Sequence, residues 1–547
     1  MCKNYVVIGE AAPMDYLVDF VALPKNYGTD AYYARSDIKE IRRIVFETLD
    51  KLNGCIDLKE QIRGRKVIIK PNLVGVYHNS GFRVADMPQS TDPRVFEAIV
   101  DYLTKFTNKI TIAESAGGGI GTGSYFKIAG YDKIAKQYNA DLVALENQPI
   151  DRYMLPKAKV MKEVCIPRLI SEVVRSEAYY VSVPKMKTNL YTGVTLGFKN
   201  AMGILPKNLR YRNHNYQINE KLVDLLYLFK PNLTIIDGIV GAEGLTPGPV
   251  DPVDMRMIVA SNNSVEADRI TTEMMGFDSS ENMLIKEAVS RGFGDPNVTI
   301  IGTPKVKKFR PADKSLMSDR FKKHFPNVKM LVGLTKNNPM IITDIHQVTP
   351  KMTRKMELAC SGGCLPAMAQ VFEMYLYTTK PSDTSFSLAI LYGRGVEIDG
   401  KKYYFDSDGK AYDTEAIKAL PMKKYAIGEC ARDMEGIVDY YTGGCCDISA
   451  CTFGISKVTG LSLPQMSLSN KGLFSLMISI LTSYQTKRRW VKQGEYVDVP
   501  YNQKDFDKIF PIPELTPAQM KMDYIEWPFP KMTKEQIKQN LKTIKLI

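Results

Sequence analysis

The chain has 547 residues, enough for about two to four domains with a sizeable buried core. Apolar residues make up 44% and charged residues 24%, which excludes a largely disordered chain. The formal net charge of +13 permits an anionic partner (nucleic acid, acidic lipid or a phosphorylated metabolite) without choosing among them. We see no signal-peptide pattern, and the most apolar late stretch, residues 473–481, is shorter than the ~20 residues of a membrane span. We therefore expect a cytoplasmic protein without a transmembrane segment.

The first three hundred residues alternate between helical and strand patterns. Apolar residues from Ile38 to Leu52 recur at helical spacing, with Asp37 placed to cap the start and Gly54 the end. Asp92-Pro93 predicts another helix start, because an acidic N-cap followed by proline is favoured there. Further helices are expected from about residue 124 and at 265–275, and strands at 66–70, 110–113, 141–145, 179–183, 233–237 and 298–301. This alternation predicts an α/β fold, a parallel or mixed sheet with helices on both faces, in which ligands gather at the carboxyl ends of the strands.

Basic residues concentrate between Lys305 and Lys329, where nine Lys or Arg and two Asp give a net charge of +7. An anion-binding patch and a solvated connector both fit this run. It has no interleaved aromatic residues beyond Phe309, Phe321 and Phe325 and no recognised nucleic-acid-binding motif, which argues against a nucleic-acid-binding surface. Beyond it, the pattern weakens into short Tyr-rich strands. The predicted domains are an α/β substrate-binding domain (1–304), a basic connector (305–330), a smaller α+β cysteine-rich domain (331–470) and a C-terminal helix with a proline-rich arm (471–547).

A glycine-rich loop follows the strand expected at 110–113 and precedes a helix. Glycine lets backbone amides approach a ligand closely, and a helix N-terminus favours an anion. The spacing matches neither the dinucleotide fingerprint nor the P-loop, and a flexible turn fits the same residues. The candidate binding residues of this loop are Glu114, Ser115, Gly117, Gly118, Gly119, Gly121 and Ser124.

The densest polar stretch, residues 184–203, follows the strand expected at 179–183. A lysine near other cations has a lowered pKa and can act as a base, or it can hold a carboxylate or phosphate. Surface lysines on a glycine-rich loop are the alternative interpretation. Carboxylates after the strand at 233–237 can transfer protons or bind metal, or simply cap turns. The candidate catalytic residues are Lys187, Lys199, His214, Asp237 and Glu243, and Asn200 is a further candidate binding residue.

Several collinear motifs carry a family resemblance. They are Lys70-Pro71-Asn72-Leu73, Ser90-Thr91-Asp92-Pro93, Glu114 with its glycines, Gly130-Tyr131, Val183 to Thr188, Gly193 to Gly203, His214, Pro231 to Gly238 and Glu266-Ala267-Asp268. Over about residues 66–302 the chain resembles the "domain of unknown function 362" family. The resemblance implies a redox protein for many members, some with an added ferredoxin-like module whose cysteine run is absent from this sequence. Where the family commonly has His after the Lys-Thr pair, this chain has Asn189, which removes a candidate ligand or base. The order of polar segments is also distantly similar to the N-terminal part of nickel-cofactor lactate racemases, as a fold analogy.

Six of the nine cysteines fall between residues 360 and 451, several of them beside glycines. Thiolates next to glycine suit an iron–sulfur cluster, because the chain can wrap the cluster and leave amides free for its sulfides. The candidate ligands are Cys360, Cys364, Cys430 and either Cys445 or Cys446. Zinc, thiol chemistry and buried structural cysteines are the alternatives.

We expect an enzyme, and three hypotheses about its function follow. The first is an anaerobic-type metalloenzyme, an oxidoreductase or lyase that uses a 4Fe–4S cluster on a small anionic substrate and draws on an electron-donor protein. The second is a metal-independent isomerase or lyase that works by lysine and histidine acid–base chemistry. The third is an anion- or nucleic-acid-binding protein that uses the basic patch at 305–329. The sequence does not indicate an oligomeric state.

Overall fold

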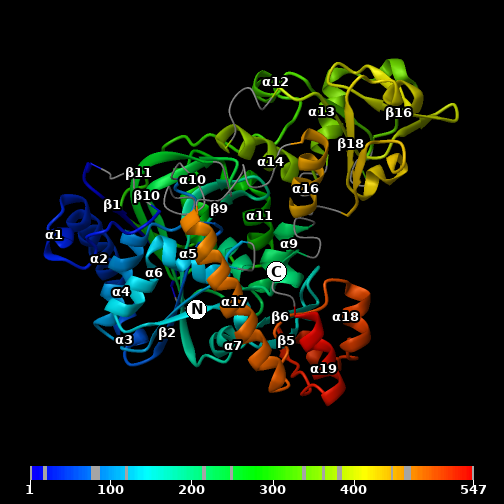
Figure 1. Ribbon diagram of the computed structural model, residues 1–547. Coiled ribbons are helices and arrows are strands. Elements are labelled where there is room, and N and C mark those ends of the chain that lie inside the picture. Colours follow the sequence, from blue (N-terminus) through cyan, green and yellow to red (C-terminus); the bar gives the residue numbers. More distant parts are fainter. Residues whose placement is uncertain are drawn as a thin grey trace. The chain divides into compact units, whose positions relative to one another are not determined.

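The structure is a computed structural model, shown in Figure 1, and its elements are named as labelled there. It describes residues 3–15, 21–75, 87–117, 121–211, 217–246, 250–335, 340–359, 364–378, 385–444, 448–460 and 470–544. The chain forms two compact units. The first takes in almost all of the chain up to Pro311 together with Ser469–Ile547, and the second is formed by Ala312–Leu468.

The predicted α/β class is confirmed by the sheet of the first unit, a mixed sheet with the strand order β12-β1-β11-β10-β7-β2-β3-β4. The strands β10, β7, β2, β3 and β4 run parallel to one another, while β11 is antiparallel to both β10 and β1. The short strands β8 and β9 attach to the side of β10. The bounds are β1 Tyr5–Glu10, β2 Lys66–Pro71, β3 Ile110–Glu114, β4 Asp141–Ala144, β7 Ala178–Val183, β8 Lys185–Asn189, β9 Gly193–Thr195, β10 Leu233–Gly244, β11 Val250–Ser261 and β12 Thr299–Ile301.

Helices cover this sheet and begin where the local sequence favours a start. Asp92 caps α4 by accepting from the backbone N–H of Arg94, with proline at the first helical position, as predicted. The helix α2 differs from the expected bounds: it runs through Gly54 and ends against Asp57, which has a left-handed backbone. Asp37 lies in its first turn and pairs with Arg35. The bounds are α1 Asp30–Tyr33, α2 Ser36–Ile56, α3 Leu58–Ile62, α4 Pro93–Thr104, α5 Thr122–Ala129, α6 Tyr131–Gln137, α7 Arg168–Val174, α8 Lys207–Tyr211, α9 Ile218–Leu225, α10 Ser264–Met274 and α11 Met283–Ser290.

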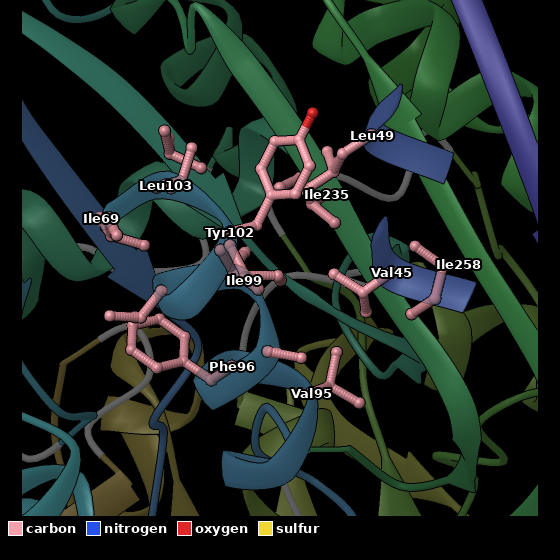
Figure 2. Close-up of a cluster of buried hydrophobic side chains, with 14 of the residues drawn as sticks. Val45, Leu49, Ile69, Val95, Phe96, Ile99, Tyr102, Leu103, Ile235 and Ile258 are labelled. Atoms are coloured by element: carbon pink, nitrogen blue, oxygen red, sulfur yellow. The ribbon is translucent and has the colours of Figure 1, made fainter. Parts of the chain in front are cut away.

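The largest hydrophobic cluster of the first unit lies between the sheet and the helices α2 and α4, and a second one packs α10 against β1, β10 and β11. Figure 2 shows Val45 of α2 and Ile99 of α4 packed against strand residues such as Ile235 of β10. Each of these side chains is fully buried, and burying such a side chain stabilises the fold by about 1.5–3 kcal/mol. The core therefore holds the strands in a fixed register, so that groups at their carboxyl ends have fixed positions.

The C-terminal segment completes the first unit. The helix α17 (Asn470–Lys492, orange in Figure 1) packs against α5, where a Cβ at Gly121 would lie 2.8 Å from Leu476 and one at Gly123 would lie 3.0 Å from Ser479. The strand β20 (Ile525–Glu526) pairs with β5 (Ile150–Met154), which in turn pairs with β6 (Glu163–Pro167). The helices α18 (Gln503–Ile509) and α19 (Lys534–Thr543) end this segment. The predicted arm at 471–547 thus belongs to the same unit as the α/β domain.

The second unit has its own sheet, with the strand order β15-β16-β13-β14-β18-β19 and β17 attached to β16. The strands β13, β14, β18 and β19 are parallel, and β15, β16 and β17 form an antiparallel edge. The bounds are β13 Val328–Val332, β14 Leu388–Tyr392, β15 Val396–Ile398, β16 Lys401–Phe405, β17 Ala411–Asp413, β18 Lys423–Ile427, β19 Tyr440–Thr442, α12 Asp319–His324, α13 Pro350–Leu358, α14 Cys364–Thr378, α15 Thr414–Lys418 and α16 Ile448–Thr459.

The predicted basic connector at 305–330 is divided between the two units at Pro311. Within the first unit, the ammonium of Lys305 lies 2.5 Å from Glu10, and the guanidinium of Arg310 pairs with Asp251. Phe309 between them is buried. These two charges are therefore already matched by carboxylates of their own unit. Among the described residues, we find no helix that is both long and apolar enough to cross a membrane.

Candidate functional site

Buried charged side chains of the first unit gather at one edge of its sheet. Lys70 lies near the end of β2, Glu114 ends β3, and Lys185 follows β7 after a single proline. Asp237 lies within β10, directly opposite Lys185 of β8. Because the carboxyl ends of parallel strands meet at one edge, these residues come together despite large separations in the sequence.

A buried ion pair joins β2 to β3. The Nζ of Lys70 lies 2.9 Å from Oε2 of Glu114 and donates to Oδ1 of Asn200 at 2.9 Å. Burial lowers the pKa of Lys70 and raises the pKa of Glu114, while the attraction between the two charges opposes both shifts. Gly203 makes this approach possible, since a Cβ there would lie 2.5 Å from Oε1 of Glu114.

A second buried ion pair joins β8 to β10. The Nζ of Lys185 lies 2.9 Å from Oδ2 of Asp237, and both side chains are fully buried. The same carboxylate oxygen accepts a hydrogen bond from the backbone N–H of Asp92 at 2.8 Å. Burial raises the pKa of Asp237, and the neighbouring charge of Lys185 opposes the rise. Asp92 forms its own ion pair with Arg94 at 2.6 Å, so this second acidic group is also balanced.

Lys187 lies on β8, two residues from Lys185, and is fully buried. Its Nζ donates to Oδ1 of Asn72 at 2.7 Å and to the backbone carbonyl of Gln89. Burial lowers the pKa of Lys187 well below its ordinary value, and the positive charges of Lys199 and Lys185 lower it further. The alternative interpretation of surface lysines is wrong for Lys185 and Lys187, because β8 takes them into the interior and supplies polar partners there.

Lys199 is positioned by a turn that Asp268 holds in place. The backbone N–H groups of Gly197 and Phe198 donate to the Asp268 carboxylate at 2.5 and 3.3 Å, where the 3₁₀ segment Phe198–Ile204 begins. Gly197 is needed at this point, because a Cβ would lie 2.7 Å from Oδ1 of Asp268. Burial raises the pKa of Asp268 well above its usual range. This buried carboxyl group therefore sets the direction of the backbone that carries Lys199 and Asn200.

Lys199 differs from the other lysines of the group in two respects. It is only partly buried, whereas Lys70, Lys185 and Lys187 are buried almost completely. Among the described residues it also takes part in no hydrogen bond or ion pair. Burial and the positive charge of Lys70 lower the pKa of Lys199 to about 8. We call Lys70, Lys185, Lys187 and Lys199, with Glu114 and Asp237, the lysine cluster.

Residues 67–273, which contain the whole lysine cluster, match the model of a family described as Domain of unknown function (DUF362). We call this matched part of the chain the DUF362 domain. A "Thylakoid-associated protein sll1697" from Synechocystis sp. (strain ATCC 27184 / PCC 6803 / Kazusa) is 28% identical over 104 residues, which are 18% of this chain and 32% of that protein. The match thus spans about a third of the relative's length. No solved structure shows a significant match.

The glycine-rich loop of the DUF362 domain uses its described amides internally. The backbone N–H of Ser115 donates to its neighbour Glu114, and that of Gly117 donates to the carbonyl of Val74 at 2.9 Å. Gly121 is the left-handed N-cap of α5, and the hydroxyl of Ser124 donates to its carbonyl at 2.7 Å. The described part of the loop therefore offers few of its donors to a ligand. Gly118 and Gly119 lie outside the described residues.

Of the remaining catalytic candidates, the structure describes only Glu243, which has no described contact with the lysine cluster. Glu243 accepts from the backbone N–H of Arg310 at 2.7 Å and faces that guanidinium instead. His214 lies outside the described residues. The structure thus brings together Lys187, Lys199 and Asp237 from the predicted catalytic set, and Glu114 and Asn200 from the predicted binding set.

The cysteine candidates belong to the second unit. Cys364 begins α14, and its Sγ lies 4.0 Å from the carbonyl oxygen of Gly444. A Cβ at Gly428 would lie 2.5 Å from the same sulfur. Gly428 is two residues before Cys430, which is partly buried. Cys360, Cys445 and Cys446 lie outside the described residues, and the described residues alone contain no group of three or more metal-ligating side chains.

Sequence reasoning did not assign Lys70, Asn72, Lys185 or Asp268 to the site. The available signal was a charged residue directly at the end of an apolar strand, as at Lys70 after Val67-Ile68-Ile69. Such a residue is costly to bury alone and therefore indicates a partner elsewhere in the chain. Asp268 gives a weaker signal, because an acidic residue on the buried face of a helix also occurs in ordinary caps and turns.

Proposed function

We propose that the DUF362 domain is a cytoplasmic enzyme that binds a small anionic metabolite, a carboxylate or a phosphate, and acts on it by proton transfer through Lys199. The observation that carries this proposal is the one partly exposed lysine of the cluster, which no described residue pairs. Proton abstraction from a carbon next to a carboxylate, leading to isomerisation or elimination, is the chemistry that such a group supports.

The charge balance of the lysine cluster supports an anionic ligand. Its four lysines face two carboxylates, and each of these carboxylates already forms an ion pair with its own lysine. Lys187 and Lys199 therefore have no carboxylate of their own among the described residues. An anion that enters beside Lys199 would supply the missing negative charge in a poorly solvated place, where such an interaction is stronger than in water.

The lowered pKa of Lys199 supports its role as a base. A general base works best when its pKa lies close to the working pH, and about 8 meets that requirement whereas 10.5 does not. Asp268 would act as a positioning residue, because it holds the Gly197–Phe198 turn rather than facing the ligand.

The test is proton exchange in D₂O, followed by NMR, on a panel of small carboxylates that carry a C–H next to the carboxylate. We expect exchange of at least one of them by the wild-type protein and its loss in Lys199→Ala. Lys207→Ala is the matched control, since Lys207 is also a partly buried lysine with a lowered pKa but lies outside the lysine cluster. Exchange that persists in Lys199→Ala, or no exchange with any panel member, overturns the proposal.

A second candidate function concerns the second unit, where the cysteines fit an iron–sulfur cluster. The sulfur of Cys364 contacts the backbone just before Cys430 and just before Cys445, so the fold draws together the segments that carry the predicted ligands. Gly428 has no Cβ, which lets the Cys364 sulfur approach its backbone, and Gly444 has open space beside it, and glycines of this kind let a chain wrap a cluster. With a cluster bound there, the protein would take electrons from a donor protein and carry out redox or elimination chemistry. Zinc remains the alternative metal.

Iron and acid-labile sulfide should be measured after purification without oxygen. We expect both in the wild-type protein, with visible absorbance, and their loss in Cys364→Ser and Cys430→Ser. Cys55→Ser is the control, because Cys55 lies on α2 of the first unit. A colourless protein without iron contradicts the cluster, and stoichiometric zinc in its place favours the alternative.

A further inference from the structure

Lys199 is suited to covalent chemistry as well as proton transfer. We propose that Lys199 is a nucleophile that forms an imine with the carbonyl group of a small 2-oxo carboxylate. This inference rests on the proposed anion site, and it goes further by assigning the ligand class and a covalent step. Three features of the lysine cluster support it: access, partners and charge.

Access separates Lys199 from its neighbours. Lys70, Lys185 and Lys187 are enclosed, with exposed fractions of 1% or less, while Lys199 remains partly exposed on the 3₁₀ segment after β9. Lys199 is therefore the most exposed lysine of the group. A nucleophile must be able to touch the carbon that it attacks, and Lys199 comes closer to that condition than the other three lysines do in the described structure.

Lys199 also differs from the other three lysines in its hydrogen-bond partners. The ammonium groups of Lys70 and Lys185 form ion pairs with carboxylates, and Lys187 donates to two oxygen atoms. Their nitrogen atoms are engaged in structural hydrogen bonds that an attack would have to break. The nitrogen of Lys199 takes part in none within the described residues, so its lone pair is available once the proton has left.

The charges around Lys199 favour the neutral amine that a nucleophilic attack requires. Positive neighbours favour the neutral amine at Lys199, and its pKa of about 8 is consistent with this. A lysine desolvated beside another cation is a recognised way to activate the amine for imine formation. The same positive charges attract a carboxylate, and a carboxylate directly next to a carbonyl places the electrophilic carbon near the amine. The cluster therefore favours a ligand that carries both groups.

The covalent step balances as follows. The neutral amine of Lys199 adds to the carbonyl carbon and forms a C–N bond, while the carbonyl oxygen takes up the proton that the nitrogen loses. A second proton on that oxygen allows it to leave as water, which gives a protonated imine. One amine, one carbonyl and one proton thus yield one iminium ion and one water molecule. The iminium ion draws electrons from the bonds of the next carbon, on the side away from the carboxylate, which favours loss of a proton from that carbon to give an enamine.

The experiment uses the full chain with three probes: pyruvate, which carries carbonyl and carboxylate; acetone, which carries the carbonyl alone; and acetate, which carries the carboxylate alone. Each is incubated with borohydride, which reduces an imine to a stable amine, and the adduct is located by peptide mass spectrometry. We expect one pyruvate adduct on Lys199, little adduct from acetone, and protection of Lys199 by acetate. The adduct should be lost in Lys199→Arg and retained in Lys207→Arg.

The outcomes separate the imine from the anion site. Acetate protection of Lys199 from a general amine reagent, without any pyruvate adduct, overturns the imine and leaves the anion site standing. Adducts spread over many lysines, or undiminished in Lys199→Arg, also overturn it. If acetate does not protect and no adduct forms, both the imine and the proposed function fail. Circular dichroism of each variant shows whether a lost adduct reflects a lost fold.

Discussion

The ionisation of Lys199 is the property on which its chemistry depends. At pH 7, a pKa of about 8 leaves roughly a tenth of the side chain neutral, against about 0.03% for a lysine with a pKa of 10.5. The reactive amine is therefore about 300-fold more abundant than in an ordinary lysine. This difference corresponds to about 3 kcal/mol against the charged form, of which burial contributes the larger part and Lys70 the smaller.

The informative perturbation removes the charge of Lys70 together with that of its partner. Lys70→Met combined with Glu114→Gln takes away the positive neighbour without leaving a buried carboxylate unpaired. The pKa of Lys199 should then rise by about one pH unit at most, because the larger cause, burial, is retained. It should remain below that of an exposed lysine.

Competitive acetylation measures this pKa. The protein is treated with trace acetic anhydride from about pH 6 to about pH 11, beside a short peptide that carries one lysine, and the acetylated peptides are quantified by mass spectrometry. We expect half-maximal labelling of Lys199 near pH 8 in the wild-type protein and at a higher pH in the double variant. A midpoint near 10.5 in the wild-type protein, or a lower midpoint in the double variant, refutes the reasoning.

Three further predictions concern stability and are measured by urea unfolding. Lys185→Met or Asp237→Asn alone should lower the free energy of unfolding by about 3–5 kcal/mol, because each leaves a buried charge unpaired. The double variant should lose less stability than either single variant. Additive losses would contradict this prediction. Burial raises the pKa of Asp268 above 3.8, so the folded protein holds this proton more tightly than the unfolded chain does. The free energy of unfolding should therefore fall by about 1.4 kcal/mol per pH unit as the pH rises from 3.8 to the raised pKa. The variant Asp268→Asn should lack this fall. Gly203→Ala should destabilise the protein by about 1–3 kcal/mol, because the added Cβ displaces the Lys70–Glu114 ion pair. Gly54→Ala, in the interior of α2 where nothing lies near, should stabilise it by up to about 1 kcal/mol. Equal effects of the two substitutions would rule out the close contact between Gly203 and the ion pair.

Most of the strands that the apolar runs predicted are present at nearly the expected bounds, because a continuous apolar run is what a strand buried on both faces requires. The exception is the strand expected at 233–237, since β10 continues to Gly244. The strand β11 was not expected, since its sequence contains Pro252 and several charged residues. It is stabilised by pairing with β10 and β1 on its two sides. The local sequence pattern of β11 cannot predict this pairing. Long-range pairing therefore outweighed local propensity there.

In the candidate site, too, local motifs predicted some residues, whereas contacts between distant parts of the chain could not be predicted. The glycine and lysine motifs named Lys187, Lys199 and Asn200, and the structure brings all three to the lysine cluster, because the strand before them ends at that edge of the sheet. Their roles toward a ligand stay predictions. The burial of Lys185 was missed, since its partner Asp237 lies 52 residues away in the sequence. Glu243 makes its described contacts with Arg310, 67 residues later in the sequence, and its catalytic role stays a prediction. Which partner a charge finds is set by the topology, and a local motif contains no information on that point.

The position of α17 has a consequence for how the chain is made. This helix and β20 complete the first unit, yet they are synthesised only after the whole second unit has left the ribosome. The glycine loop before α5 must therefore wait for about 350 residues of further synthesis before Leu476 and Ser479 reach it. The main segment of the second unit, Ala312–Leu468, can fold during that interval, while the first unit stays incomplete. A fragment that stops at Pro311 would lack α17 and β20, and we expect it to aggregate more readily than the full chain.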